Sequence, residues 1–196
     1  MQVFPALTAR PLPPHATFWQ PSIETASVMP EDPATEVMTD LKVVSAVTID
    51  PQASIEHAMR LMVRRNVRLL LVVNVDNEVE GLITATDLLG EKPLLYLRQY
   101  GGTRRDIAVG DIMTPHERLE VLAYADVRSA RVGHVVSTLA RSHRQHALVA
   151  DYDSAGHPMI RGIFSTSQIS RQLGQVLQTG EIAHSFAEIE AALNHE

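Results

Sequence analysis

Hydrophobic residues follow two alternating spacings along the chain, one typical of strands and one typical of helices. Short runs rich in Val, Ile and Leu predict strands at residues 43–49, 69–75 and 79–84. Between the first two runs, apolar residues recur every three or four positions, as on one face of a helix: Ile55, Ala58, Met59 and Met62. Ser54 is a candidate cap for this helix, and Gly90 can end a second helix that starts near Thr84. The first half is therefore predicted to form a β-α-β-β-α unit.

The second half repeats this order of patterns. Apolar runs predict strands at residues 118–125, 147–150 and 159–164, followed by a helix at 165–173. The helix between the first two strands carries the stripe Val132, Val135, Val136 and Leu139. One such unit leaves an apolar face that a second copy can cover. We therefore expect an α/β (α+β) fold of two β-α-β-β-α repeats packed with pseudo-twofold symmetry, with two equivalent clefts between them.

Each repeat opens and closes with a similar phrase. The openings are Val37-Met38-Thr39 and Ile112-Met113-Thr114-Pro115, and the endings are Gly81-x-x-Thr84-x-x-Asp87 and Gly162-x-x-Ser165-x-x-Gln168. Only the first ending contains a carboxylate. The two clefts are therefore predicted to differ chemically at this position.

The ending phrase has two interpretations. Thr84-x-x-Asp87 at a strand-to-helix turn is a capping box, and Ser165-x-x-Gln168 satisfies the same rule. Alternatively, the helix start binds a phosphate beside the Thr84 and Thr86 hydroxyls, while Asp87 accepts hydrogen bonds from ribose hydroxyls. Gln168 offers one uncharged acceptor oxygen, so the second site should hold a ribose less well.

Composition excludes several classes of function. The net charge of −6 argues against a broad nucleic-acid or anionic-membrane surface, and the chain has no cysteine for disulfides, thiol catalysis or thiolate-bound metals. No apolar run is long enough to span a bilayer, and the first residues lack the order of a signal peptide, so we expect a cytoplasmic protein. No nucleophile elbow, P-loop or glycine-rich dinucleotide turn is present, so catalysis is not expected.

The predicted boundaries follow from proline content and the repeat. Most of the prolines fall in residues 1–35, which suits an extended arm. The two repeats are then expected at 36–91 and 109–175, with a linker at 92–108 that holds a short helix and a loop. A tail at 176–196 contains an amphipathic stretch through Ile182, Phe186, Ile189 and Leu193, which can dock on the body or on a second subunit.

Histidines and arginines supply further candidates. His143 and His146 form the only close histidine pair, without a supporting carboxylate, so no metal site is expected. The arginines at the end of the first helix are expected mainly to form a solvated face, although Arg68 can point inward: Arg60, Arg64, Arg65 and Arg68. Arg104 and Arg105 in the linker and Arg131 before the helix of the second half are further candidates for binding polyphosphate.

The doubled unit, its openings and its endings together resemble a tandem cystathionine β-synthase (CBS) domain pair, or Bateman module, over about residues 36–175. The resemblance implies a non-enzymatic regulatory module, here stand-alone, and we expect it to form a homodimer. Its clefts would bind AMP, ADP, ATP or S-adenosylmethionine and signal by a change in conformation or partner affinity. The alternative is a ligand-free scaffold that dimerises and presents its arm or tail to a protein partner.

The resemblance also implies roles for individual residues. Thr84, Thr86 and Asp87 would hold phosphate and ribose, and His146 would reach a phosphate from the start of its strand. The adenine pocket would be lined by residues of the first and second strands: Val44, Ser45, Val47 and Leu70. Ser165, Ser167 and Gln168 would form the second, weaker site, in which Gln168 departs from the family's aspartate.

Overall fold

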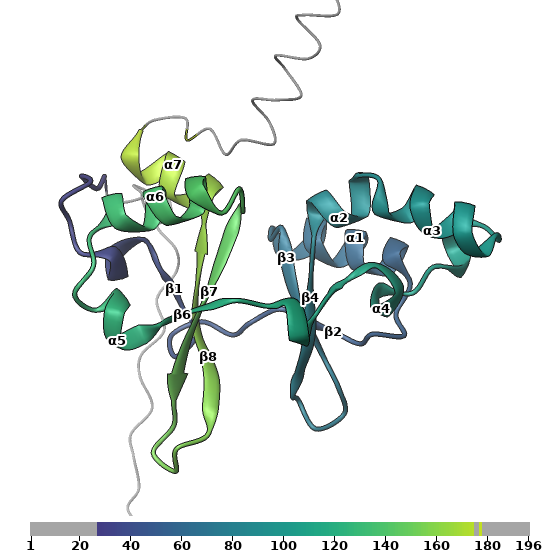
Figure 1. The fold of residues 1–196 in the computed structure, drawn as a ribbon, viewed down its shortest axis with the longest axis horizontal. Coiled ribbons are helices and arrows are strands. Elements are labelled where there is room, and N and C mark those ends of the chain that lie inside the picture. Colours follow the sequence, from purple (N-terminus) through teal and green to yellow (C-terminus); the bar gives the residue numbers. More distant parts are fainter. Residues whose placement is uncertain (1–26, 175–176, 178–196) are drawn as a thin grey trace, which may run out of the picture.

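The computed structural model describes residues 27–174 and residue 177, and these residues form two four-stranded sheets (Figure 1). The first sheet has the order β2 (Thr48–Ile49), β3 (Leu69–Val73), β4 (Val79–Thr84) and β5 (Thr114–Pro115). The second sheet has the order β1 (Thr39–Asp40), β8 (Pro158–Ser165), β7 (His146–Tyr152) and β6 (Val121–Ala123). The mixed α/β class and the two sheets agree with the predicted fold.

Helices cover the outer faces of both sheets. The first repeat contains α1 (Ile55–Arg65) and α2 (Ala85–Leu89), and the second contains α5 (Tyr124–Val127), α6 (Val132–Arg141) and α7 (Thr166–Leu173). The connection between them holds α3 (Lys92–Tyr100) and α4 (Val109–Ile112). Short 3-10 turns lie at Ala34–Val37, Arg104–Asp106 and His116–Arg118. No helix of the described residues is both long enough and apolar enough to cross a membrane.

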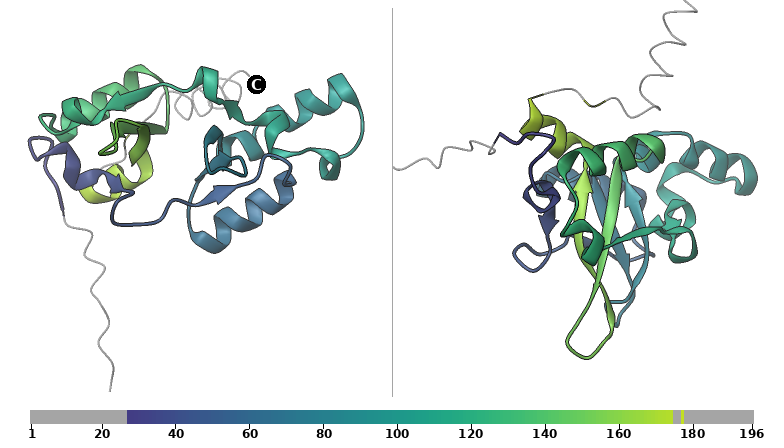
Figure 2. Two further views of the ribbon diagram at one scale, coloured as in Figure 1. Left: turned by 90° about the horizontal axis from the view of Figure 1, so that it is seen from below. Right: turned by 60° about the vertical axis from the view of Figure 1, so that its left-hand side comes forward.

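The two repeats exchange their opening strands. β1 precedes the first repeat but pairs with β8 of the second sheet, and β5 precedes the second repeat but pairs with β4 of the first. Seen from below, the two lobes are joined by the segments that follow these strands (Figure 2). The hairpins also correspond, because His146 pairs with Ser165 as Leu69 pairs with Thr84. The pseudo-twofold relation therefore extends to the strand register.

Each repeat has its own apolar core, and a third cluster joins them. The first core includes Ile55, Leu70 and Ile83, and the second includes Leu139, Val149 and Phe164. Between the sheets, Leu69 and Leu71 of β3 are buried in one cluster with Leu148 of β7. The first core also contains Ile107 and Ile112 from the segment that leads into the second repeat, and the second core contains Val28 and Val37 from the segment that leads into the first. Each half therefore depends on the other for part of its core.

Glycines permit the strand exchange. A Cβ at Gly81 would lie 2.5 Å from the backbone oxygen of Thr114, and a Cβ at Gly162 would lie 2.5 Å from the sulfur of Met38. Both positions face the opening segment of the other repeat. The glycine at the start of each ending phrase is thus required by close packing of an exchanged strand.

Local predictions were confirmed for most elements. The Ser54 hydroxyl accepts from the His57 amide at the start of α1, and Asn66 ends that helix in the left-handed conformation. The predicted strand at 43–49 was wrong over its first part, because the chain turns around Asp40 and only Thr48–Ile49 pairs. The strand expected at 118–125 is shortened to Val121–Ala123 by the flanking helical turns.

The end of the predicted arm packs on the second repeat. Val28 is buried and its amide donates to the carbonyl of Gln172 at 3.0 Å, while the Ala34 amide donates to Ala130. Residues 28–34 thus belong to the body. The remainder of the arm and the amphipathic stretch predicted at 181–193 lie outside the described residues.

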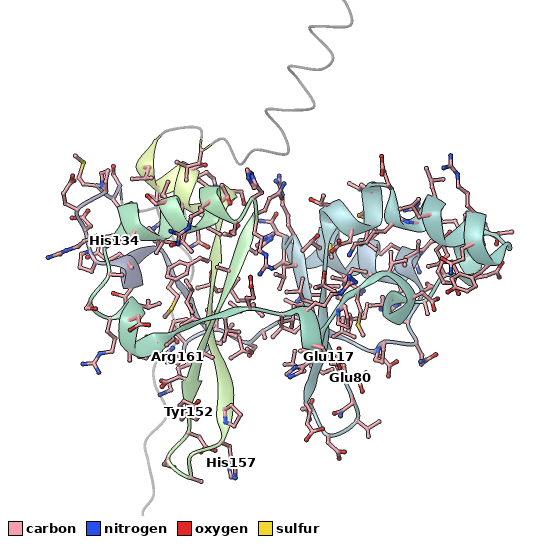
Figure 3. The ribbon with its side chains drawn as sticks, viewed as in Figure 1. Glu80, Glu117, His134, Tyr152, His157 and Arg161 are labelled. Carbon is pink, nitrogen blue, oxygen red and sulfur yellow. The ribbon has the colours of Figure 1, made fainter. Side chains whose placement is uncertain are left out.

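A largely buried arginine links β8 to neighbouring elements. Figure 3 shows Arg161 on β8, with Tyr152 and His157 further along the β7–β8 hairpin. The guanidinium donates to Asp40 of β1, lies 3.9 Å from Asp151 and stacks 4.8 Å from the Tyr124 ring centre. This cluster stabilises the exchanged strand at the end of the sheet away from the clefts.

Candidate functional site

The first ending phrase forms a complete capping box. The Asp87 amide donates to the Thr84 hydroxyl oxygen at 3.2 Å, and Asp87 Oδ2 accepts from the Thr84 amide at 2.8 Å. The Thr84 hydroxyl in turn donates to Oδ2 at 2.7 Å. The structural interpretation of this phrase is therefore confirmed, and the box holds the Asp87 carboxylate at the strand-to-helix turn.

Lys92 forms a salt bridge with the other carboxylate oxygen of Asp87. Its ammonium group lies 2.7 Å from Asp87 Oδ1 and donates to the carbonyl of Ile112 at 3.0 Å. Asp87 is therefore linked to the segment that opens the second repeat. A carboxylate offers about four lone-pair positions, of which Thr84 and Lys92 use three.

Asp87 lines a cleft of about 300 Å³ between the repeats. Hydroxyl groups come from Thr84, Thr86 and Thr114, and the basic side chains are those of Arg118, His143, Arg144 and His146. Apolar surface comes from Leu82, Leu119 and Leu148. At the cleft, Arg144 pairs with Glu120 at 2.9 Å, although both side chains are exposed. We call this the Asp87 cleft; it offers a carboxylate, hydroxyls, cations and an apolar wall.

The second ending phrase is built differently. The capping box predicted for Ser165 and Gln168 was wrong, because no side chain caps α7. Gln168 has one more methylene than an aspartate, and its Oε1 accepts from the Thr39 hydroxyl of β1 at 3.0 Å. The Ser165 hydroxyl lies 3.0 Å from that of Ser167. The phrase is thus tied to the exchanged strand instead of to its own helix.

Gln168 lines a larger cleft of about 850 Å³, which we call the Gln168 cleft. Its apolar wall comes mainly from the end of α1 and the start of β3, including Met59, Met62, Val63, Val67 and Leu69. Its polar lining includes Thr39, Asn66, Ser165, Ser167, Ser170 and two arginines, Arg68 and Arg171. Among the described residues, none that lines this cleft is an Asp or a Glu.

His146 lies between the two clefts and lines both. Its burial lowers the pKa of the imidazole to about 4, assisted by the nearby Arg68 and opposed by Asp87. The ring is therefore neutral near pH 7 and can donate one hydrogen bond and accept another. His146 occupies the position that Leu69 has in the first repeat, so this polar partition exists in only one repeat.

The structure brings together some of the residues predicted for the ligand site and not others. Thr84, Thr86, Asp87 and His146 line one cleft, and Ser165, Ser167 and Gln168 line the other. The four residues expected around adenine line neither cleft: Val44, Ser45, Val47 and Leu70. Leu70 is fully buried in the first core and Val47 packs against it, while Val44 and Ser45 lie exposed in the connection before β2.

Several lining residues were not singled out from the sequence. Lys92, Arg118 and Arg144 reach the Asp87 cleft region from outside the ending phrase. Thr39 and Thr114 line opposite clefts, and their shared place in the two opening phrases was the available signal. Within the described part of the chain, no group of three or more His, Asp or Glu residues is arranged to hold a metal ion.

Comparisons with known proteins agree with the repeat. The family model described as CBS domain matches residues 34–93. The chain is similar to the crystal structure of an uncharacterized conserved protein from Pyrococcus horikoshii, with 25% identity, a TM-score of 0.53, and coverage of 78% of this chain and 100% of that one. The comparison with curated protein sequences gives no match.

A second similar structure contains bound nucleosides. It is the CBS domain pair of protein MJ0100 in complex with 5′-methylthioadenosine and S-adenosyl-L-methionine. The identity is 19%, the TM-score is 0.50, and the match covers 74% of this chain and 98% of that one. This similarity shows that the two chains share a fold.

Proposed function

The chain carries a tandem pair of CBS domains, the first at residues 34–93 and the second its structural repeat, and from this premise we propose that it is a regulatory module for an adenosine-containing ligand. The candidate ligands are AMP, ADP, ATP and S-adenosylmethionine. The proposed site is the Asp87 cleft, with Thr84, Thr86, Asp87 and His146 as contacts. The bound nucleosides of MJ0100 support this ligand class.

The observation that carries the proposal is the position of Asp87. Its carboxylate faces a cleft that also offers hydroxyls, cations and three leucines. A ribose diol can donate to a carboxylate, a phosphate or carboxylate group of the ligand can pair with Arg118 or Arg144, and a base can lie on apolar surface. A ribose would take the place of the Thr84 hydroxyl on Oδ2 or share Oδ1 with Lys92.

The signalling part of the proposal follows from where the lining residues originate. Thr84 and Asp87 belong to the first repeat, whereas Arg144 and His146 belong to the second. A ligand that contacts both repeats binds more tightly to one relative arrangement than to others. Binding would therefore shift the population of arrangements and alter the affinity for a partner.

Calorimetric titration tests the site. AMP, ADP, ATP, S-adenosylmethionine and GMP as control are titrated into the wild type, Asp87→Asn and the matched variant Gln168→Asn. We expect saturable binding of at least one adenosine ligand, weakened at least tenfold in Asp87→Asn, because hydrogen bonds to a charged acceptor contribute about 1.5–3 kcal/mol. Gln168→Asn should retain wild-type affinity. Equal affinity in the Asp87 variant would refute the site, and no binding of any adenosine ligand would refute the function.

A homodimeric scaffold is a second candidate, favoured by exposed apolar residues. Leu89 of α2 is 72% exposed, and Leu94, Leu95 and Tyr100 of α3 are also exposed. An apolar surface of this kind is typical of a protein interface. If light scattering finds a dimer that Leu94→Lys with Leu95→Lys converts to a monomer, this surface holds the subunits together. A dimer that is unchanged in this variant would exclude the surface.

A further inference from the structure

The Gln168 cleft combines apolar surface with uncompensated positive charge. Val63 is 74% exposed beside the half-buried Met59, so the apolar wall is open to solvent. Arg68 and Arg171 are exposed on the lining, and neither is in a salt bridge within the described residues. An occupant with apolar side chains and carboxylates would complement this cleft.

The last described residues of the chain lie beside this cleft. Ser170 and Arg171 of α7 line it, and α7 ends at Gly174 in the left-handed conformation. The amide of Leu177 then donates to the Ser170 hydroxyl at 3.1 Å, and its side chain packs against the second core. Leu177 is therefore hydrogen-bonded to a residue that lines the cleft.

The following segment, residues 178–196, has the complementary chemistry. It contains four glutamates and neither Lys nor Arg: Glu181, Glu188, Glu190 and Glu196. Its large apolar residues are spaced by four, three and four positions, as on one face of a helix: Ile182, Phe186, Ile189 and Leu193. The sequence thus places carboxylates and an apolar stripe within a few residues of the cleft.

We propose that the segment 178–196 docks into the Gln168 cleft of its own chain. Apolar side chains of the stripe, beginning with Ile182 and Phe186, contact Met59, Met62 and Val63, and the glutamates pair with Arg68 and Arg171. The short connection from Leu177 gives the segment a high effective concentration at the cleft, in the millimolar range for short flexible links, so weak contacts suffice. The Gln168 cleft would then be an intramolecular docking site.

The absence of cysteine allows a direct test on the full chain without ligand. Ala191→Cys places a single spin label on the side of the stretch opposite the apolar stripe, and amide signals are recorded by NMR. We expect the label to weaken the signals of residues 59–69 and 165–171 and to leave those of 92–100 unchanged. Undiminished signals at the cleft, or losses centred elsewhere, would overturn the proposal.

Matched variants identify the contacts. Phe186→Ser removes an apolar anchor and Arg171→Glu reverses a cleft charge, so both should restore the weakened signals. Arg141→Glu, at an exposed arginine outside the cleft lining, should leave them weakened. Broadening that persists in Arg171→Glu and Phe186→Ser would refute docking in this cleft. A mixture of spin-labelled chain without ¹⁵N and ¹⁵N-labelled chain without a spin label should show no loss of amide signal at the cleft. A loss there would show docking between copies and overturn the intramolecular proposal.

Discussion

The two clefts occupy equivalent places in the fold but have different chemistry. In the Asp87 cleft, the ending phrase closes on itself as a capping box and leaves a carboxylate beside hydroxyls and cations. In the Gln168 cleft, the longer amide side chain reaches the exchanged strand, and the described residues that line this larger space include two arginines and no Asp or Glu. A duplicated fold can therefore keep its backbone symmetry while one changed side chain redirects the polar contacts of a site.

The two repeats also differ in the residues that pack around equivalent positions of their strands. Gly81 lies against backbone of the exchanged segment, whereas Gly162 lies against the flexible side chain of Met38. At the first residue of the hairpin, between the two clefts, the second repeat has His146 where the first repeat has Leu69. These paired positions allow the comparison to be tested by making the same kind of change in each repeat.

The largest expected effect is at the glycine pair. Gly81→Ala forces a Cβ against the Thr114 carbonyl, which can move only with its strand, and should lower the free energy of unfolding by about 3 kcal/mol. Gly162→Ala meets the thioether of Met38, which can change rotamer, and should cost about 1 kcal/mol. Urea unfolding of both variants measures the difference. Equal losses would contradict the assignment of the rigid contact to the first repeat.

The next effect concerns pH and His146. Because its pKa is lowered to about 4 in the folded state, the unfolded chain binds the proton first as pH falls from about 6.5. Folding should therefore lose roughly 2 kcal/mol from this group between pH 7 and pH 5. His146→Leu, which copies the first repeat at this position, should reduce the fall in unfolding free energy by that amount. A pH dependence unchanged in the variant would show that His146 is not the buried group responsible.

The smallest effect separates the two ending phrases. Thr84→Ala removes the hydroxyl that caps α2 and should cost about 1 kcal/mol. Ser165→Ala removes a hydroxyl whose one side-chain hydrogen bond among the described residues is to Ser167, and should change the unfolding free energy by less than about 0.5 kcal/mol. Thermal unfolding of the two variants provides the test. A greater loss in Ser165→Ala would mean that the second phrase caps its helix after all.

Local patterns were sufficient to predict most of the fold. The helix at 55–65 and the strands at 69–73 and 79–84 follow from spacing, capping and turn residues, which act within a few positions. The exchange of β1 and β5 was not predicted, because pairing between residues such as Thr39 and Ile163 depends on how the two halves pack. The strand predicted at 43–49 was wrong over its first part, because the amides of Val43 and Val44 donate to the Asp40 carbonyl in a turn and only Thr48–Ile49 forms β2.

The candidate site was predicted only in part. Thr84 and Asp87 were predicted as site residues because their spacing is typical of a capping box at a strand-to-helix turn, which depends only on neighbouring residues. The cleft positions of Arg144 and Thr114 depend on how the repeats pack, and so does the contact of Lys92 with Ile112. The chain offers no local signal that Gln168 turns toward Thr39, because these residues are far apart in sequence.

Locating the bound ligand tests directly whether the Asp87 cleft is the binding site. Amide chemical shifts of the ¹⁵N-labelled chain are followed while the adenosine ligand that binds most tightly is added, with GMP as control. We expect the largest shift changes at residues 84–87 and 114–120, and small changes at 165–171. Changes centred on 165–171, or none with any adenosine ligand, would contradict the assignment of ligand binding to the Asp87 cleft.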